Sequence, residues 1–234
     1  QNADSSFSIE KAQAAYPNGM GMLARPSDRL VGKIANVAGN TGATANRGPR
    51  ETAEYVNAAQ KWAMERTRLG IPLLMHEEAL HGFTAREATS FPQAIGLASS
   101  FDPELVTRVF SVAAREMRAR GGNLALAPVV DVARDPRWGR IEETYGEDPH
   151  HLGELGMAFV RGAQAVVLTQ PKHYAVNSIE DTRFDVDVNL DESTLHEVYL
   201  PHFQDVLVDA GAASVMAAYN HVNGTPASES PALL

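Results

Sequence analysis

Short apolar runs alternate with longer amphipathic stretches along this chain. Five runs are continuously apolar or nearly so and rich in strand-forming residues, and they lie at residues 19–24, 71–75, 124–132, 165–168 and 214–219. A continuous run, unlike an alternating one, is typical of a strand whose two faces are both covered, as in a parallel sheet flanked by helices. The order strand, loop, helix, strand therefore predicts an α/β fold.

The stretches between the runs carry helix signals. One apolar residue recurs every four positions within residues 101–120, in the series Leu105, Val109, Ala113 and Met117. Asp102 followed by Pro103 predicts the start of this helix, because an aspartate caps free backbone N–H groups and proline needs no hydrogen bond in the first turn. Asp148 and Asp191 predict two similar starts. Residues 184–190 alternate strictly and predict a short ribbon that decorates a loop.

Polar residues follow the predicted strands. They form the groups His76-Glu77-Glu78, Asp131 to Asp135, Lys172-His173 and Asn220-His221. Functional groups at the carboxyl ends of strands are typical of (β/α)8 barrels and of doubly wound sheets. No G-x-G-x-x-G follows an early strand, which disfavours a dinucleotide-binding sheet. A complete barrel takes roughly 250 residues and eight strands, so we predict a TIM-barrel-like domain that is incomplete, with about five strand–helix units. Residues 39–48 are predicted to form a loop.

Composition narrows the function. The 234 residues suit one domain, and the net charge of -9 argues against nucleic acid as a partner. The arginines of residues 115–120 are predicted to lie on a solvated helix face. There is no cysteine, so disulfides and thiolate zinc sites are excluded. No apolar run approaches the roughly 20 residues of a membrane span, and the N-terminus does not resemble a signal peptide, so localisation stays open.

Three segments could carry chemistry. His76 and His81 invite a metalloprotease interpretation, but they are five residues apart, whereas the H-E-x-x-H motif needs four. Residues 135–148 are charge-rich and follow a buried strand, and Arg140 offers a planar donor fork that can reach inward. Lys172 and His173 end another strand and can donate to a polyhydroxylated ligand. Nothing points to a nucleotide, flavin or metal cofactor.

Taken together, the motifs resemble the N-terminal barrel domain of glycoside hydrolase family 3 over about residues 8–234. Six segments carry the resemblance, in the family's order: Leu69-Gly70-Ile71-Pro72, Glu78-Ala79-Leu80-His81-Gly82, Phe91-Pro92-Gln93, Arg134 to Asp148, Lys172 to Asn177 and Val215 to Asn220. The resemblance implies an exo-acting β-glycosidase that removes one sugar from a non-reducing end with retention of configuration. It further implies that the partner is a small β-linked oligosaccharide or glycoside. The substrate-binding residues would be Glu78, Arg140, Lys172, His173, Met216 and Tyr219.

Two departures from the family pattern bear on activity and substrate. Retention needs two carboxyl groups, but the family's Ser-Asp-Trp-like nucleophile motif does not occur within residues 1–234, and its acid/base glutamate usually comes from a second domain. We therefore expect residues 1–234 to be part of the barrel domain and to be inactive alone. Glu78 stands where many glucosidases have aspartate, which favours a β-xylosidase, whereas the segment from Phe184 to Leu200 is closer to β-glucosidases.

Two other classes of function remain open on the residues alone. The chain could belong to a non-catalytic carbohydrate-binding protein that kept the sugar-binding donors and lost the carboxylate pair. It could also belong to an unrelated barrel enzyme that uses carboxylates such as Glu77 and Glu143. A Ser-Asp-Trp motif in a longer reading frame would separate the first of these from a hydrolase.

Overall fold

A computed structural model describes residues 1–2, 4–28 and 46–234, so the predicted loop at 39–48 lies mostly outside the described residues. The strands are short: β1 (Met22–Ala24), β2 (Leu74–Glu77), β3 (Leu124–Ala125), β4 (Leu168–Thr169), β5 (Lys172–Tyr174), β6 (Asp187–Val188), β7 (Met216–Ala217), β8 (His221–Val222) and β9 (Thr225–Pro226). Each of the five predicted runs contains or overlaps one of the strands β1, β2, β3, β4 and β7. The five strand predictions are therefore confirmed.

Helices connect many of these strands. The α-helices are α1 (Ile9–Ala15), α2 (Pro49–Arg66), α3 (Ala94–Ala98), α4 (Pro103–Ala119), α5 (Pro149–Ala163), α6 (Glu192–Thr194) and α7 (Pro201–Gln204). Two π-helical segments, η2 (Leu195–Tyr199) and η3 (Asp205–Asp209), extend α6 and α7. Two short 3-10 helices are η1 (Ile141–Glu143) and η4 (Ala227–Glu229). The three predicted helix starts are confirmed, because Asp102, Asp148 and Asp191 each accept a backbone N–H three residues ahead.

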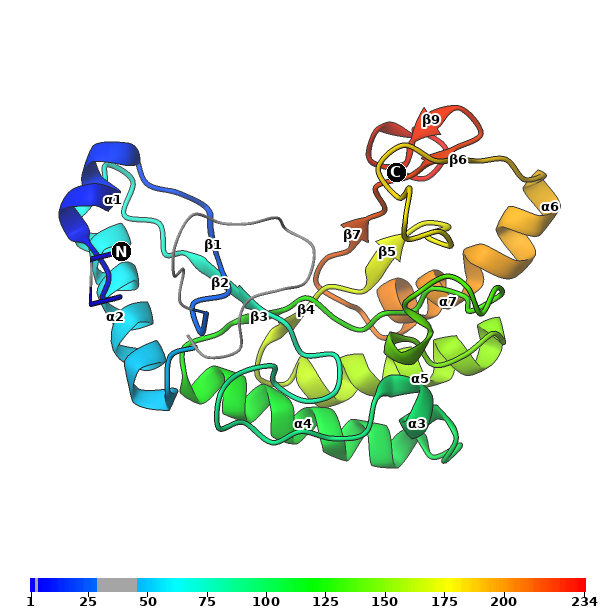
Figure 1. Ribbon diagram of the computed structural model, residues 1–234, viewed down its shortest axis with the longest axis horizontal. Coiled ribbons are helices and arrows are strands. Elements are labelled where there is room, and N and C mark those ends of the chain that lie inside the picture. Colours follow the sequence, from blue (N-terminus) through cyan, green and yellow to red (C-terminus); the bar gives the residue numbers. More distant parts are fainter. Residues whose placement is uncertain (3, 29–45) are drawn as a thin grey trace.

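The barrel strands run parallel in chain order. β1, β2, β3 and β4 form one sheet, and β5 pairs with β7 in a second. A bridge between Val129, which follows β3, and Lys172 of β5 joins the two sheets into one curved arrangement of β1, β2, β3, β4, β5 and β7 (Figure 1). Within the described residues, this curved sheet is open and does not close into a cylinder. The parallel strand order and the open sheet together confirm the predicted fold, which is TIM-barrel-like and incomplete.

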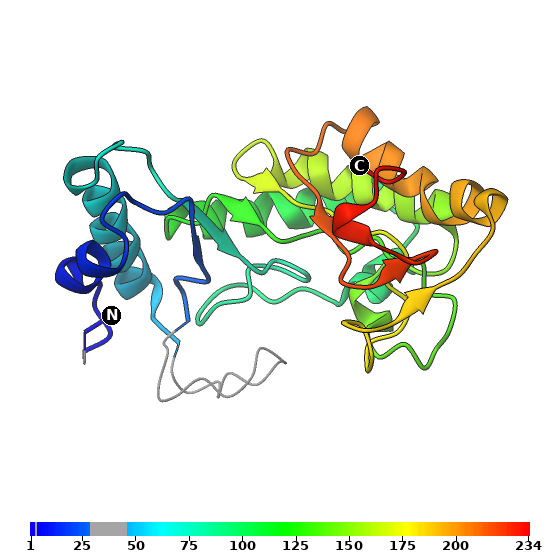
Figure 2. The ribbon, with the colours of Figure 1, turned by 90° about the horizontal axis from the view of Figure 1, so that it is seen from above.

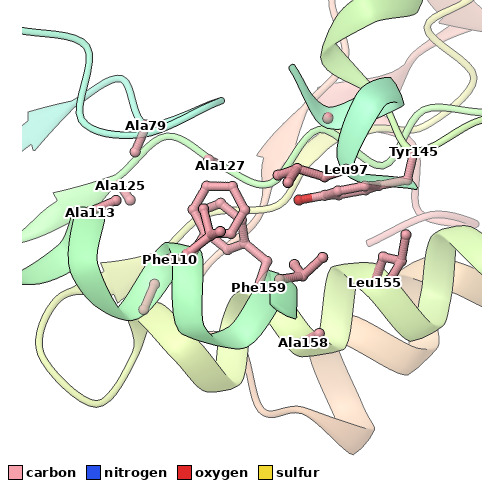
Figure 3. Close-up of a cluster of buried hydrophobic side chains, with 14 of the residues drawn as sticks. Ala79, Leu97, Phe110, Ala113, Ala125, Ala127, Tyr145, Leu155, Ala158 and Phe159 are labelled. Carbon is pink, nitrogen blue, oxygen red and sulfur yellow. The ribbon is translucent and has the colours of Figure 1, made fainter. Parts of the chain in front are cut away.

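Helices α4 and α5 lie side by side along the sheet and bury the largest apolar cluster (Figures 1 and 2). Phe110 of α4 and Phe159 of α5 meet with their ring centroids 3.9 Å apart beneath Ala125 and Ala127 of the sheet (Figure 3). The approach is close because Gly162 faces α4, where a Cβ atom would lie 2.4 Å from the carbonyl oxygen of Thr107. This packing fixes β3 and therefore the residues at its carboxyl end.

Three parts of the fold differ from the expectation. Arg120 is not on a solvated helix face: it is buried and donates to the carbonyl oxygens of Arg86 and Glu87. Helix α2 was not signalled by the apolar pattern, because most of its buried residues are small or polar. The alternating segment at 184–190 forms β6, which belongs to a three-stranded sheet with β8 and β9 rather than to a simple ribbon.

No helix in the described ranges is both long and apolar enough to cross a membrane.

Candidate sugar-binding site

Glu78 and Lys172 meet beside the ends of β2 and β4. Glu78 directly follows β2, whereas Lys172 comes three residues after β4 and begins β5, so it does not end a strand as predicted. The Nζ atom of Lys172 donates to Oε2 of Glu78 at 2.9 Å, and the lysine side chain is only 4% exposed. A buried ammonium needs such a partner, because an unpaired charge in this setting costs several kcal/mol. The pair therefore places one cation and one carboxylate side by side next to the sheet.

His173 is held by Asp131, which ends the apolar run after β3. The backbone N–H of His173 donates to Oδ1 of Asp131 at 3.1 Å, and Nδ1 of the ring lies 2.7 Å from Oδ2. Both side chains are almost fully buried. The side-chain amide of Asn177 lies 3.1 Å from the same ring nitrogen. Two side chains thus contact this edge of the imidazole, and Asp131 also binds the backbone of His173.

Arg140 reaches the other edge of His173 from the loop that precedes η1. Its Nη1 lies 3.3 Å from Nε2 of His173, while its Nε and Nη2 donate to the two carboxylate oxygens of Glu143 at 3.1 and 2.6 Å. Glu180 lies 3.8 Å from the same guanidinium. Burial alone would lower the pKa of Arg140, but its hydrogen bond to Glu143 and the negative charges of Glu143, Glu180 and Asp131 outweigh this and raise the pKa.

These contacts determine the tautomer of His173. The carboxylate of Asp131 accepts, so Nδ1 carries the proton, and the guanidinium of Arg140 can only donate, so Nε2 offers its lone pair. The ring is then bound on both edges, by Asp131 at Nδ1 and by Arg140 at Nε2. A ligand hydroxyl that takes the place of Arg140 at Nε2 would donate a hydrogen bond to the imidazole. Four side chains of the site can thus bind the hydroxyl groups of a ligand: the imidazole of His173 as an acceptor, the ammonium of Lys172 and the guanidinium of Arg140 as donors, and the carboxylate of Glu78 as an acceptor.

The structure brings four of the six predicted residues into one contact network: Glu78 pairs with Lys172, and Lys172 is bonded along the chain to His173, which contacts Arg140. Met216 is half-buried and lies beside Lys172 in the register of β5 and β7. Tyr219 is 51% exposed, and its ring packs on Phe184 with 4.7 Å between the centroids. Among the described residues, neither Met216 nor Tyr219 makes a hydrogen bond with the polar network.

Three acidic residues of the network were missed as site residues in the sequence. Asp131 was recognised as part of a polar segment but not as the partner of His173, and Glu143 and Glu180 were not recognised as partners of Arg140. Asp131 did carry a signal, because a lone acid at the end of a buried apolar run needs a donor. Glu143 and Glu180 carried none, since each lies in a charge-rich loop.

Glu77 has a different environment from its neighbour Glu78. It is buried on the helix side of β2, where it accepts both the backbone N–H and the hydroxyl of Ser27 at 2.8 Å. Burial raises the pKa of Glu77 to about 7. Glu143 is held by Arg140 at both carboxylate oxygens. The described ranges contain no group of three or more His, Cys, Asp or Glu placed to hold a metal ion.

Comparison with known proteins identifies relatives of both sugar specificities. The chain is 37% identical to a β-xylosidase of Formosa agariphila over 68% of its own length. It is also 37% identical to a periplasmic β-glucosidase of Salmonella typhimurium over 78% of its length. In both cases the chain spans 24% of the relative. The two specificities are therefore equally represented among these relatives.

Solved structures agree with the sequence comparison. The fold superimposes on a β-glucosidase of Erythrobacter marinus with a TM-score of 0.80 and 33% identity, over 93% of this chain and 28% of that one. A β-glucosidase of Thermotoga neapolitana, solved in complex with α-D-glucose, gives a TM-score of 0.66 and 35% identity over 68% of this chain and 24% of that one. The model of the glycosyl hydrolase family 3 N terminal domain matches residues 24–234. The chain therefore belongs to glycosyl hydrolase family 3, with the TIM-barrel-like fold of the family's N-terminal domain.

Proposed function

We propose that this chain is the sugar-binding part of an exo-acting, retaining β-glycosidase that cleaves O-glycosidic bonds at the non-reducing end of a small β-linked substrate. The observation that carries the proposal is the network of Glu78, Lys172, His173 and Arg140, which is shielded from solvent at the carboxyl ends of the strands. Such preorganised donors hold ring hydroxyls while charge develops at the anomeric carbon. Met216 and Tyr219 line the same site.

Catalysis in this proposal depends on residues beyond this chain. Residues 1–234 are part of the barrel domain, the nucleophile lies in a segment that follows Leu234, and the acid/base carboxyl belongs to a second domain. Support comes from the missing Ser-Asp-Trp motif and from the engagement of Glu77 and Glu143 in other contacts. A pair of carboxyl groups roughly 5 to 5.5 Å apart is needed for retention.

Sugar binding is the first test. Glucose and xylose are titrated into the chain, and binding is followed by saturation-transfer NMR. Lys172→Met should weaken binding about 10- to 100-fold, because a hydrogen bond to a charged group is worth about 1.5–3 kcal/mol. Lys61→Met is the matched control, since Lys61 is exposed on α2 and should leave binding unchanged. Equal binding by the Lys172 variant and the wild type would refute the site.

Hydrolysis is the second test and addresses the catalytic residues. The chain is incubated with chromogenic β-xyloside and β-glucoside beside a heat-inactivated control, and we expect no turnover. Turnover would mean that a working carboxylate pair lies within these residues, which would overturn the placement of the nucleophile. The same assay on a longer product of the gene should show release of one sugar from the non-reducing end.

The finer proposal is a preference for β-xylosides over β-glucosides. Glu78 reaches Lys172 with a side chain one methylene longer than aspartate, and this length fills space that the hydroxymethyl group of a hexose needs. One methylene of fit is worth about 1–3 kcal/mol, so a preference rather than exclusion is expected. Glu78→Asp in the longer enzyme should raise glucoside activity relative to xyloside activity. An unchanged ratio would favour the alternative, a β-glucosidase.

A further inference from the structure

A tight turn follows β1 and lies beside the end of β2 (Figure 1). The turn comprises residues 25–28, and the backbone N–H of Asp28 donates to the carbonyl oxygen of Arg25 at 2.9 Å. The N–H of Arg25 in turn donates to the carbonyl oxygen of His76 at 2.8 Å, shortly before Glu78 in the chain. The turn is therefore joined to the strand end that carries Glu78.

Two buried charged residues hold this turn. The backbone N–H and the hydroxyl of Ser27 both donate to the carboxylate of Glu77 at 2.8 Å, and Ser27 is fully buried. The guanidinium of Arg47 donates to the carbonyl oxygens of Pro26 and Asp28. Arg47 is itself buried, and its backbone N–H donates to the carbonyl oxygen of Ser27. Burying a charge costs free energy even when it is paired, so two such charges around one short turn indicate that its position matters.

The backbone of Arg25 is strained. Its φ of 43° lies in the left-handed region, which residues other than glycine, asparagine and aspartate seldom adopt. Glycine would adopt this conformation at lower cost, so the side chain rather than the backbone explains an arginine here. The guanidinium is 38% exposed, and its Nε lies 2.8 Å from Oδ2 of Asp28. The turn thus carries a fixed pair of one donor group and one acceptor group.

This ion pair lies within electrostatic reach of the sugar-binding network. Burial raises the pKa of Asp28, the positive charge of Arg25 lowers it, and the negative charge of Glu78 raises it. His76, whose pKa is lowered by burial, also responds to the charges of Arg25 and Lys172. Because β1 and β4 lie on opposite sides of β2 in the sheet, the turn and Lys172 approach Glu78 from opposite sides.

We propose, building on the function proposed above, that Arg25 and Asp28 are two further substrate-binding residues, which hold adjacent hydroxyl groups of the terminal sugar on the β1 side of Glu78. The guanidinium donates to one hydroxyl and the carboxylate accepts from its neighbour. A sugar ring offers adjacent hydroxyls, each of which can both donate and accept. Glu77 contributes only through the turn, because it holds Ser27 and thereby keeps both binding groups in place.

Arg25→Gly is the central test, because it removes the guanidinium and relieves the backbone. The Kd values of glucose and xylose are measured by NMR titration of the chain. Arg25→Gly and Asp28→Asn should each weaken binding about 10-fold, as expected for the loss of a hydrogen bond to a charged group. The melting temperature of Arg25→Gly should stay unchanged. Arg50→Gln is the matched control, since Arg50 forms an ion pair of the same 2.8 Å length with Glu54 at the exposed surface of α2.

A second measurement follows the side chain of Arg25 in the wild type. Its Nε–H signal should shift when glucose is added, whereas the signal of Arg50 should not. This measurement needs no substitution, so it decides the question even if a variant unfolds. A shift confined to Arg25, or weaker binding by a stable Arg25→Gly variant, supports the proposal.

The opposite outcomes separate this proposal from the proposed function. Wild-type affinity in both Arg25→Gly and Asp28→Asn, or a signal of Arg25 that does not respond to glucose, would show that the turn is structural only and would overturn the proposal. The sugar site around Lys172 would remain in that case. If the wild-type chain binds neither sugar, the proposed function itself fails and the role of the turn fails with it.

Discussion

Asp131 holds His173 at two points, accepting its backbone N–H at 3.1 Å and facing its ring Nδ1 at 2.7 Å. One buried carboxylate thereby binds both the backbone and the ring of a residue in the middle of β5. The same principle operates wherever a carboxylate orients an imidazole whose other nitrogen faces a reacting or binding partner.

Replacing Asp131 by asparagine should disturb both its contact with the backbone of His173 and its contact with the ring. Asparagine offers one acceptor and one donor to the two N–H groups of His173, so one contact becomes donor against donor. We expect a loss of about 1–3 kcal/mol in the free energy of unfolding and a shift of the ring proton towards Nε2, where it opposes Arg140. Nitrogen-15 NMR of the imidazole reports the tautomer. Asp135→Asn is the control, because Asp135 pairs with Arg137 at the surface; an unchanged tautomer in Asp131→Asn would contradict the assignment.

Glu77 should make the fold less stable as the pH rises. Its pKa is raised by burial from 4.5 to about 7, so between these values the folded carboxyl keeps a proton that the unfolded one has lost. The free energy of unfolding therefore falls across pH 4.5–7, by on the order of 3 kcal/mol. Glu77→Gln should abolish this contribution. Denaturant unfolding at several pH values measures it, and the same pH slope in wild type and variant would show that Glu77 does not titrate in this window.

His202 should make the fold less stable as the pH falls, the opposite of the effect of Glu77. It is buried against Phe203, and burial lowers its pKa from 6.5 to about 4. The unfolded ring takes up a proton below pH 6.5 that the folded ring refuses, so stability is lost as the pH falls towards 4, again by on the order of 3 kcal/mol. In wild type, the contributions of Glu77 and His202 oppose each other. His202→Leu should therefore expose the slope caused by Glu77, and a profile in this variant that still falls towards acid would be the contrary result.

Gly162 should not tolerate a methyl group. A Cβ there would lie 2.4 Å from the backbone oxygen of Thr107, where α4 and α5 cross. Gly162→Ala should cost about 1–3 kcal/mol, because two packed helices must move apart. Gly96→Ala in α3 is the matched control, since its nearest neighbour would be 3.5 Å away, and the better helix propensity of alanine should leave stability unchanged or raised. Equal melting temperatures for both variants would show that the crossing adapts.

The sequence predicted where strands and helices lie better than it predicted which distant residues contact one another. Apolar runs located the barrel strands, and Asp102, Asp148 and Asp191 marked helix starts, because these signals act over a few residues. Helix α2 was not predicted because alanine and threonine supply much of its buried face, which weakens the apolar pattern. Arg120 was misplaced because its burial depends on carbonyl groups more than 30 residues away in the chain.

The site shows the same division. Lys172 and Glu78 were proposed from their positions after strands, yet their pairing joins residues 94 positions apart and has no local signature. The resemblance to a known family supplied the six residues, while only the three-dimensional arrangement identified Asp131 and Glu180 as their supports. Long-range pairing is set by the register of the sheet, which short sequence patterns do not encode.

Both charged donors of the proposed sugar-binding network already have an acceptor: Lys172 has Glu78 and Arg140 has Glu143. Binding a sugar here is therefore an exchange, in which hydroxyl groups displace internal partners and the net number of hydrogen bonds changes little. A sugar that lacks one hydroxyl leaves an intact ion pair behind instead of a stranded charge, so its penalty is small. In the proposed glycosidase, discrimination would then come from shape, and deoxygenated sugars should be accepted more readily than bulkier ones.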